Sequence, residues 1–240
     1  MVGPVLAGIG AGVAAGGVLL WRACAVPQSQ LLGPALIRGP AQGNRVALTF
    51  DDGPTPPFTD RVLDILRDRA AVATFFVCGR NVERYPDVAR RIRAEGHTIG
   101  NHTYSHPYLY FQSRARIAEE IDRTQEIIQN VLGEQPQIFR PPYGGRWFSL
   151  HSLLRERGMR LVQWSDSSRD WELEAEAVSA AILRNLRSGS IILLHDGREA
   201  LPYEDGIDCA GAIGALPSII DGARSAGLEF VPVNDFLIPG

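Results

Sequence analysis

The feature that most constrains the fold is a regular alternation of short apolar runs with longer amphipathic stretches. The short runs have the length and the branched or aromatic side chains of buried strands, whereas the longer stretches repeat apolar residues at helical spacing. Strands that alternate with helices form parallel sheets, because each helix returns the chain to the start of the next strand. The alternation occurs seven times, with short runs at residues 46–50, 73–77, 98–101, 137–139, 160–163, 190–194 and 229–232.

The helical stretches between these runs are amphipathic. In the longest one, Ile117, Ile121 and Ile128 recur at helical intervals between charged residues, and Gly133 provides a C-terminal stop. We predict helices at residues 60–68, 86–95, 113–132, 149–157, 175–186 and 210–226. The sequence therefore predicts an α/β fold of mainly parallel strands.

The chain divides into three segments by composition. Residues 1–25 are hydrophobic, residues 26–44 are rich in Pro, Gly and Gln without apolar periodicity, and residues 45–240 carry the strand and helix pattern. We interpret these segments as a signal or anchor, a linker and one catalytic domain.

The N-terminal segment favours export or membrane attachment. Residues 2–20 contain no charged residue, and a span of about 20 apolar residues crosses a bilayer. Ala23 and Ala25 form a weak cleavage signal, so a secreted form and a membrane-anchored form both stay open, as does a buried apolar helix. Arg22 opposes export, because positive charge beside a spanning segment favours the cytoplasmic side.

Charge and cysteine content exclude several function classes. The chain contains no lysine, so mechanisms that use a lysine nucleophile or Schiff base are excluded. The net charge is −3 and there is no run of basic residues, so the charge pattern does not indicate a nucleic-acid-binding protein. Cys24, Cys78 and Cys209 lack metal-binding spacing. Cys78 and Cys209 would pair only in an oxidising compartment, and unpaired buried cysteines are the favoured interpretation.

Two adjacent carboxylates mark the end of the first predicted strand. Asp51 and Asp52 precede a Gly-Pro turn, and His102 and His106 follow the third strand at a four-residue spacing. Two histidines and one aspartate form a three-ligand site for zinc or a similar divalent ion, with an open position for water. Taken alone, the aspartates also suit a turn and the histidines also suit an ordinary loop.

Three further polar clusters follow the fourth, fifth and sixth predicted strands, at residues 140–145, 166–171 and 195–196. In a barrel of parallel strands, the loops at the C-terminal ends of the strands meet on one rim. We therefore expect all of these clusters to converge on one site.

Five of these motifs together resemble the polysaccharide deacetylase family, also called the NodB-homology domain or carbohydrate esterase family 4. In order along the chain they are Thr-Phe-Asp-Asp-Gly-Pro (49–54), His-Thr-Tyr-Ser-His (102–106), Arg-Pro-Pro-Tyr-Gly-Gly (140–145), Asp-Trp (170–171) and Leu-Leu-His (193–195). The resemblance covers roughly residues 45–236. It implies a distorted (β/α)7 barrel and metal-dependent hydrolysis of N-acetyl groups.

The resemblance assigns the metal to Asp52, His102 and His106, and it makes Asp51 the general base. Elementary chemistry agrees, because one carboxylate of the pair binds the metal while its neighbour takes a proton from water. Arg140 is the expected partner of Asp51, with a simple ion-pair role as the alternative.

The remaining roles concern the leaving group and the acetyl pocket. His195 is expected to protonate the leaving amine. Asp170 is expected to pair with it and raise its pKa, with a simple ion-pair role as the alternative for Asp170. The backbone N–H of Tyr143 is expected to stabilise the oxyanion together with the metal. Trp171 and Leu194 are expected to line the pocket for the acetyl methyl group.

The fourth motif departs from the pattern of many relatives, which carry an aspartate three residues after Trp164. This chain has Ser167 at that position and an acid one place earlier, at Asp166. The departure puts the groove wall and the substrate preference in doubt, but not the reaction.

The sequence thus predicts a metal-dependent deacetylase acting on N-acetylated amino sugars in a peptidoglycan or chitin-like glycan. Zinc is the favoured ion, with cobalt, nickel or iron as alternatives. A related amidase, deformylase or O-acetyl esterase, and a non-catalytic glycan-binding module, stay open as other functions.

Overall fold

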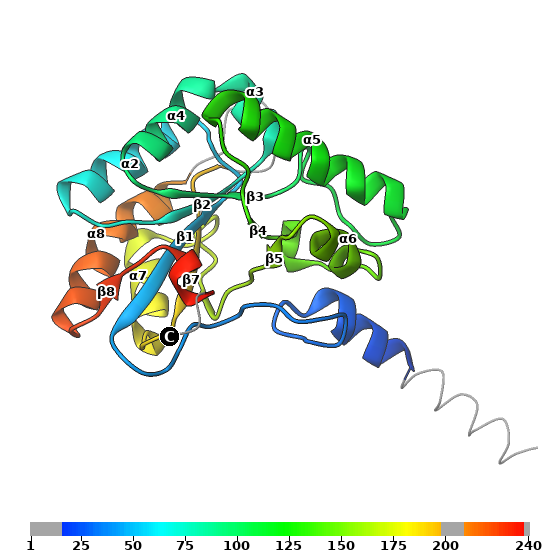
Figure 1. Cartoon of the computed structure of the whole chain (residues 1–240). Coiled ribbons are helices and arrows are strands. Elements are labelled where there is room, and N and C mark those ends of the chain that lie inside the picture. The colour runs from blue at the N-terminus through cyan, green and yellow to red at the C-terminus, as the bar shows by residue number, and fades with distance from the viewer. Residues whose placement is uncertain (1–15, 198–208, 238–240) are drawn as a thin grey trace, which may run out of the picture.

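A single sheet of parallel strands forms the centre of the molecule (Figure 1). The computed structural model of the chain describes residues 16–197 and 209–237. The strands are β1 (Arg45–Asp51), β2 (Thr74–Val77), β3 (Thr98–Asn101), β4 (Ile138–Phe139), β5 (Arg160–Leu161), β6 (Asp166–Ser167), β7 (Ile191–His195) and β8 (Glu229–Phe230). Their order is β5-β4-β3-β2-β1-β7-β6, and β8 pairs with the start of β1. Every pairing between these strands is parallel, so the predicted distorted barrel of mainly parallel strands is confirmed.

Helices cover the outer face of this sheet (Figure 1). They are α2 (Phe58–Asp68), α3 (Gly79–Arg84), α4 (Pro86–Ala94), α5 (Arg114–Leu132), α6 (Leu150–Glu156), α7 (Ala175–Asn185) and α8 (Ala210–Ser225). Two short 3-10 helices, η1 (Pro142–Gly144) and η2 (Val233–Phe236), complete the fold. The longest predicted helix is α5, which begins after the Ser113 cap and ends at Gly133, whose φ of 75° stops the helix.

Strand alternation decides which side chains reach the inside of the barrel. Successive side chains of a strand point to opposite faces, so Ala47 and Asp51 of β1 share the inner face, whereas Leu48 and Phe50 share the outer face. The outer-face residues join the largest core cluster, together with side chains of α2, α7 and α8. Ala47 belongs to a second cluster, with Phe236 of η2, that fills the N-terminal end of the interior. The C-terminal end of the interior is left for polar side chains.

The segment expected to be a linker packs against the barrel. The backbone N–H of Leu36 donates to Leu161 O, at 2.9 Å, and that of Gly39 donates to Gly189 O, at 2.8 Å. Arg38 donates to Asp166 Oδ2 at 3.2 Å. Because β5 and β6 lie at opposite ends of the strand order, these contacts place residues 36–39 along the open side of the barrel.

The N-terminal helix points away from the barrel (Figure 1). Residues 16–25 are helical and their apolar side chains are mostly exposed, apart from Ala23 and Cys24. The earlier part of the predicted hydrophobic segment, residues 2–15, lies outside the described residues. No helix in the described part of the chain combines the length and the hydrophobicity needed to cross a membrane.

Candidate active site

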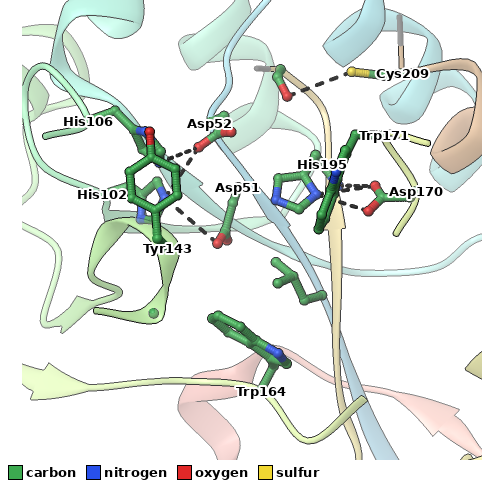
Figure 2. Close-up of a pocket in the computed structure, with 13 residues that line it drawn as sticks. Asp51, Asp52, His102, His106, Tyr143, Trp164, Asp170, Trp171, His195 and Cys209 are labelled. Atoms are coloured by element: carbon green, nitrogen blue, oxygen red, sulfur yellow. Dashed lines mark hydrogen bonds and ion pairs between the residues drawn. The ribbon is translucent and has the colours of Figure 1, made fainter. Parts of the chain in front are cut away.

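The five sequence motifs meet in one cavity of about 380 Å³ at the C-terminal ends of the strands. Figure 2 shows Asp52, His102 and His106 on one side of this cavity and the group of His195, Asp170 and Trp171 on the other. Its lining residues are Asp51, Asp52, His102, His106, Tyr143, Gly144, Trp164, Asp170, Trp171, Leu193, His195, Gly197 and Cys209. The structure therefore brings together eight of the ten predicted site residues in its lining, and Arg140 contacts one of them directly.

The two aspartates are separated by a turn in the backbone at the end of β1. Asp51 is the last residue of the strand and lies on its inner face, whereas Asp52 has a φ of 79°. A positive φ is uncommon outside glycine, although aspartate tolerates it better than most residues. The turn directs Asp52 Oδ1 to His102 Nε2, at 3.3 Å, and to His106 Nε2, at 3.1 Å. Asp51 instead faces Arg140.

The donor set at Asp52, His102 and His106 fits a divalent metal ion. One ligand atom from each of the three buried residues lies within 4.8 Å of the others. His102 Nδ1 lies 2.7 Å from the carbonyl oxygen of Arg140, an interaction that requires the proton on Nδ1 and leaves the Nε2 lone pair for a metal. Burial opposes charge on Asp52, but His106 and His102 outweigh it and hold the pKa of Asp52 well below 3.8. The site thus offers one carboxylate and two imidazoles.

Arg140 is fully buried and fixes Asp51 in one orientation. Its NH1 donates to Asp51 Oδ1, at 2.6 Å, and to Thr49 Oγ1, at 2.8 Å, while NH2 donates to Gln163 O, at 3.0 Å. The guanidinium also lies 4.0 Å from the centre of the Phe76 ring. Burial lowers the pKa of Arg140 and the Asp51 carboxylate opposes that shift. The guanidinium, held by three acceptors, thus fixes the place of the Asp51 carboxylate.

His195 and Asp170 form a second polar pair across the cavity. Asp170 Oδ1 lies 3.1 Å from His195 Nδ1, and Asp170 Oδ2 accepts a hydrogen bond from the His195 backbone N–H at 2.8 Å. These two contacts set both the position and the orientation of the imidazole ring. Burial by itself would lower the pKa of His195, but Asp170, with smaller contributions from Asp52 and Asp51, raises it to about 9. The ring is therefore protonated at neutral pH.

Aromatic rings flank the two polar groups. Tyr143 lies in η1 with a φ of 56°, its ring contacts His106 edge-on at 4.6 Å, and Tyr108 stacks on it at 3.9 Å. Trp171 stands perpendicular to His195, with ring centres 5.1 Å apart. Both Tyr143 and Trp171 remain partly exposed at the cavity mouth. The walls of the cavity are thus aromatic, while its floor is charged.

The prediction that Leu194 lines the cavity is wrong. It is fully buried in the outer core cluster, and Leu193 lines the cavity instead. The reason is strand alternation, since Leu193 shares the inner face of β7 with His195 whereas Leu194 points to the opposite face.

One buried acid near the site, Asp196, is not among the predicted site residues. Asp196 is fully buried and accepts hydrogen bonds from Thr59 Oγ1, at 2.6 Å, and from the backbone N–H of Gly53, at 3.2 Å. Burial, together with Asp52 and Asp51, raises the pKa of Asp196 to about 7. Residues 195–196 were among the polar clusters expected at the site, but Asp196 itself had no assigned role.

The unusual acid of the fourth motif lies outside the cavity lining. Asp166 accepts hydrogen bonds from Arg38 and from Ser165 Oγ, at 2.6 Å, and is therefore tied to residues 36–39 rather than to the cavity. The cysteines Cys24, Cys78 and Cys209 are all buried, as the favoured interpretation expected. Cys209 also lines the cavity, which its spacing did not suggest.

Comparison with known proteins gives one consistent result. The family described as Polysaccharide deacetylase matches residues 38–162. A peptidoglycan-N-acetylglucosamine deacetylase of Bacillus cereus is 38% identical over 194 residues, covering 80% of this chain and 68% of that protein. A chitooligosaccharide deacetylase of Azorhizobium caulinodans is 36% identical over 193 residues, covering 78% of this chain and 92% of that protein.

A solved structure agrees with these sequence relatives. The crystal structure of a peptidoglycan N-acetylglucosamine deacetylase in complex with 4-naphthalen-1-yl-N-oxidanyl-benzamide superposes with a TM-score of 0.78 and 36% identity. The match covers 83% of this chain and 91% of that one.

Proposed function

Because the chain belongs to the polysaccharide deacetylase family of hydrolases, we propose that it removes acetyl groups from N-acetylated amino sugars in a glycan. The observation that carries this proposal is the arrangement of one cavity. It has a buried donor set for a metal on one side, a protonated histidine on the other, and an aspartate fixed by a buried arginine between them. Hydrolysis of an amide needs a polarised carbonyl, a base and an acid, and these groups supply all three.

We infer that Asp52, His102 and His106 hold a divalent metal ion, with zinc as the favoured ion and cobalt, nickel or iron as alternatives. When bound, the ion would polarise the acetamide carbonyl and lower the pKa of water in the cavity. The hydrogen bond between His102 Nδ1 and Arg140 O supports this assignment, because a metal-binding histidine usually donates its other ring nitrogen to a fixed acceptor.

Asp51 takes the proton of the attacking water. Its Oδ1 is held by Arg140 NH1 at 2.6 Å, and its Oδ2 lies 3.8 Å from His102 Nε2, on the side of the metal ligands. The carboxylate therefore faces the space beside the metal ligands, where the nucleophile must lie. Thr49 and Gln163 share the remaining hydrogen bonds of the guanidinium, so Arg140 itself has little freedom to move.

His195 donates a proton to the nitrogen of the departing amino sugar. The nitrogen leaves poorly as an amide anion, but once protonated it leaves as a neutral amine, and an imidazolium oriented by a carboxylate is a suitable acid. Asp170 keeps the Nδ1 proton in place, so Nε2 is the nitrogen that presents the proton to the cavity. The pKa of about 9 keeps His195 in its acid form at neutral pH.

Tyr143 and Leu193 shape the space around the acyl group. The positive φ of Tyr143 turns the backbone beside His106, and its N–H is a suitable donor to the developing oxyanion. Leu193 and Trp171 offer the apolar contacts that an acetyl methyl group needs. The aromatic cavity mouth suits a sugar ring, which presents C–H groups to the faces of aromatic side chains.

We propose peptidoglycan or a chitin-like oligosaccharide as the glycan. The relatives described above are named for these substrates, and their similarity extends over most of this chain.

We also propose that the enzyme acts outside the cytoplasm and stays attached to the membrane through its N-terminal segment. Cys24 and Ala23 are buried against the domain. The carbonyl oxygen of Cys24 accepts hydrogen bonds from Arg146 N, at 2.9 Å, and from Tyr110 Oη, at 3.4 Å. Cleavage after Ala25 would remove these contacts, which favours an uncleaved anchor. Cell fractionation with N-terminal sequencing tests this, and a mature N-terminus at residue 26 would contradict the anchor.

The function is tested by measuring acetate released from N-acetylglucosamine oligomers and from peptidoglycan by the full chain. O-acetylated and N-formylated substrates run in parallel, and His102→Ala serves as the control that removes a metal ligand. We expect acetate from the N-acetylated glycans with the wild type only. Release solely from the O-acetyl or N-formyl substrates would replace this proposal with an esterase or deformylase.

A further inference from the structure

The loop that joins the two histidine ligands has a conformation that the backbone does not favour. Thr103 has a φ of 68° and His106 has a φ of 56°, so two non-glycine residues within four positions lie in the left-handed region. Such residues persist only where surrounding contacts hold them. The relative position of His102 and His106 therefore depends on what holds the loop between them.

A single buried carboxylate on α5 contacts the middle of this loop. Glu120 Oε2 accepts hydrogen bonds from the backbone N–H groups of Tyr104 and Ser105, both at 2.8 Å. Glu120 Oε1 accepts from Ser105 Oγ at 2.7 Å. The flanking donors bond more locally, with Thr103 N donating to Asn101 Oδ1 at 2.9 Å and His106 N donating to Thr103 Oγ1 at 3.2 Å. Glu120 thus connects the loop to a rigid helix.

Packing alone does not explain why a carboxylate occupies the position of Glu120 on α5. It is 1% exposed and lies beside Ile117 and Ile121 on the buried face of α5. A buried carboxylate is costly unless it is paired and hydrogen-bonded. Here Arg116 NH2 donates to Glu120 Oε1 at 2.5 Å, and the loop supplies the other donors. An apolar residue would pack at this helix position without that requirement, so the carboxylate serves the loop.

We propose that Glu120 is a positioning residue for the metal site, holding the His102–His106 loop in the shape in which both imidazoles reach one ion. This inference rests on the metal site of the proposed function. Charged hydrogen bonds of this kind are about twice as strong as neutral ones. Loss of groups that orient metal ligands usually lowers metal affinity by about 10- to 100-fold.

The test is the affinity of the full chain for Zn²⁺ and Co²⁺, measured by chelator competition, together with the visible spectrum of the Co²⁺ form. Glu120→Met keeps the side-chain length and removes both oxygen acceptors, whereas Glu120→Gln keeps one carbonyl oxygen. The matched control is Glu119→Met, one position earlier on α5, because Glu119 pairs with the same Arg116, at 2.7 Å, but is exposed at the surface.

We expect Glu120→Met to bind metal about 10- to 100-fold more weakly than wild type with an altered Co²⁺ spectrum. We expect a smaller loss for Glu120→Gln and a change of less than about twofold for Glu119→Met, which keeps every contact of the loop. Thermal unfolding of the metal-free proteins verifies that the variants are folded. If Glu120→Met does not fold, Glu120→Gln decides the question, and a loss of affinity is expected there too.

Wild-type affinity and spectrum in a folded Glu120 variant would overturn the positioning role alone. Failure of the wild-type chain to bind either ion would instead contradict the proposed metal site. The two outcomes are distinguished by the wild-type measurement itself.

Discussion

Replacing Asp170 by asparagine removes the charge that faces His195 while keeping the size of the side chain. The wild-type carboxylate lies 3.1 Å from His195 Nδ1 and is itself buried, so little solvent screens the interaction. An opposite charge at this distance shifts a pKa by about 1–3 units. We therefore expect Asp170→Asn to lower the pKa of His195 from its wild-type value of about 9.

The size of the effect on the rate follows from the protonated fraction of the His195 imidazole. If the pKa falls by about two units, the protonated fraction of His195 at pH 8 falls from about nine-tenths to about one-tenth. The alkaline limb of kcat/KM should thus move down by about 1–3 pH units, with a loss of rate at every pH, because the asparagine also fixes the ring less well.

Stability should change in a defined direction as well. The folded-state pKa of His195 is raised above its ordinary value, so its pairing with Asp170 stabilises the fold fully below about pH 6.5. That contribution is lost as the pH rises through about 9. The difference in free energy of unfolding between wild type and Asp170→Asn should therefore be largest in acid and should shrink in alkali.

The assay is the pH profile of kcat/KM for metal-loaded enzyme on an N-acetylglucosamine oligomer. Asp166→Asn is the matched control, because Asp166 is also a buried acid with a hydrogen-bonded partner but lies outside the cavity lining. An alkaline limb that stays in place in a folded, active Asp170→Asn enzyme would refute the assignment of His195 as the acid.

Three further changes test other parts of the site. Asp51→Asn should retain metal, measured by equilibrium dialysis, and should lose about 10²–10⁴-fold in kcat because the base is gone; undiminished turnover would contradict the role of Asp51. Leu194→Ala should lower the free energy of unfolding by about 2–5 kcal/mol in chemical denaturation. Leu193→Ala should chiefly raise KM and allow larger acyl groups to be hydrolysed. A large change of KM in Leu194→Ala and none in Leu193→Ala would contradict the assignment of Leu193 to the cavity. Arg146 is buried and donates to the carbonyl oxygens of Ser29 and, at 3.3 Å, Gly33. Arg146→Met should therefore speed proteolysis of residues 24–33, and unchanged cleavage would show that Arg146 does not hold this segment against the domain.

The sequence predicted the framework because periodicity follows burial. Each predicted strand is present. A largely apolar run such as 46–50 fits a strand covered on both faces, and residues 46–50 are all buried in β1. The pattern missed β6 and α3. β6 consists of two polar residues, Asp166 and Ser167, so it has no apolar run, and the six residues of α3 are too few to establish a helical period.

The site was predictable in composition but less so in orientation. The motifs gave Asp52, His102 and His106 together, and the structure brings their ligand atoms close to one another. The error at Leu194 arose because a motif names neighbouring residues without their faces, although counting two positions back from His195 identifies Leu193. Motifs also omit supporting contacts from distant elements, such as the carboxylate that holds the histidine loop. The signal for that residue was a lone acid on the buried face of an amphipathic helix.

The most direct test of the central claim is mass spectrometry of N-acetylglucosamine oligomers and muropeptides after incubation with the full chain. Metal-stripped, zinc-loaded and cobalt-loaded protein are compared at equal concentration. The account predicts loss of acetyl groups from the glycan with the metal-loaded forms and none with the stripped form. Intact glycans in every sample, with the protein folded and metal bound, would contradict it, and so would equal deacetylation by the metal-stripped protein.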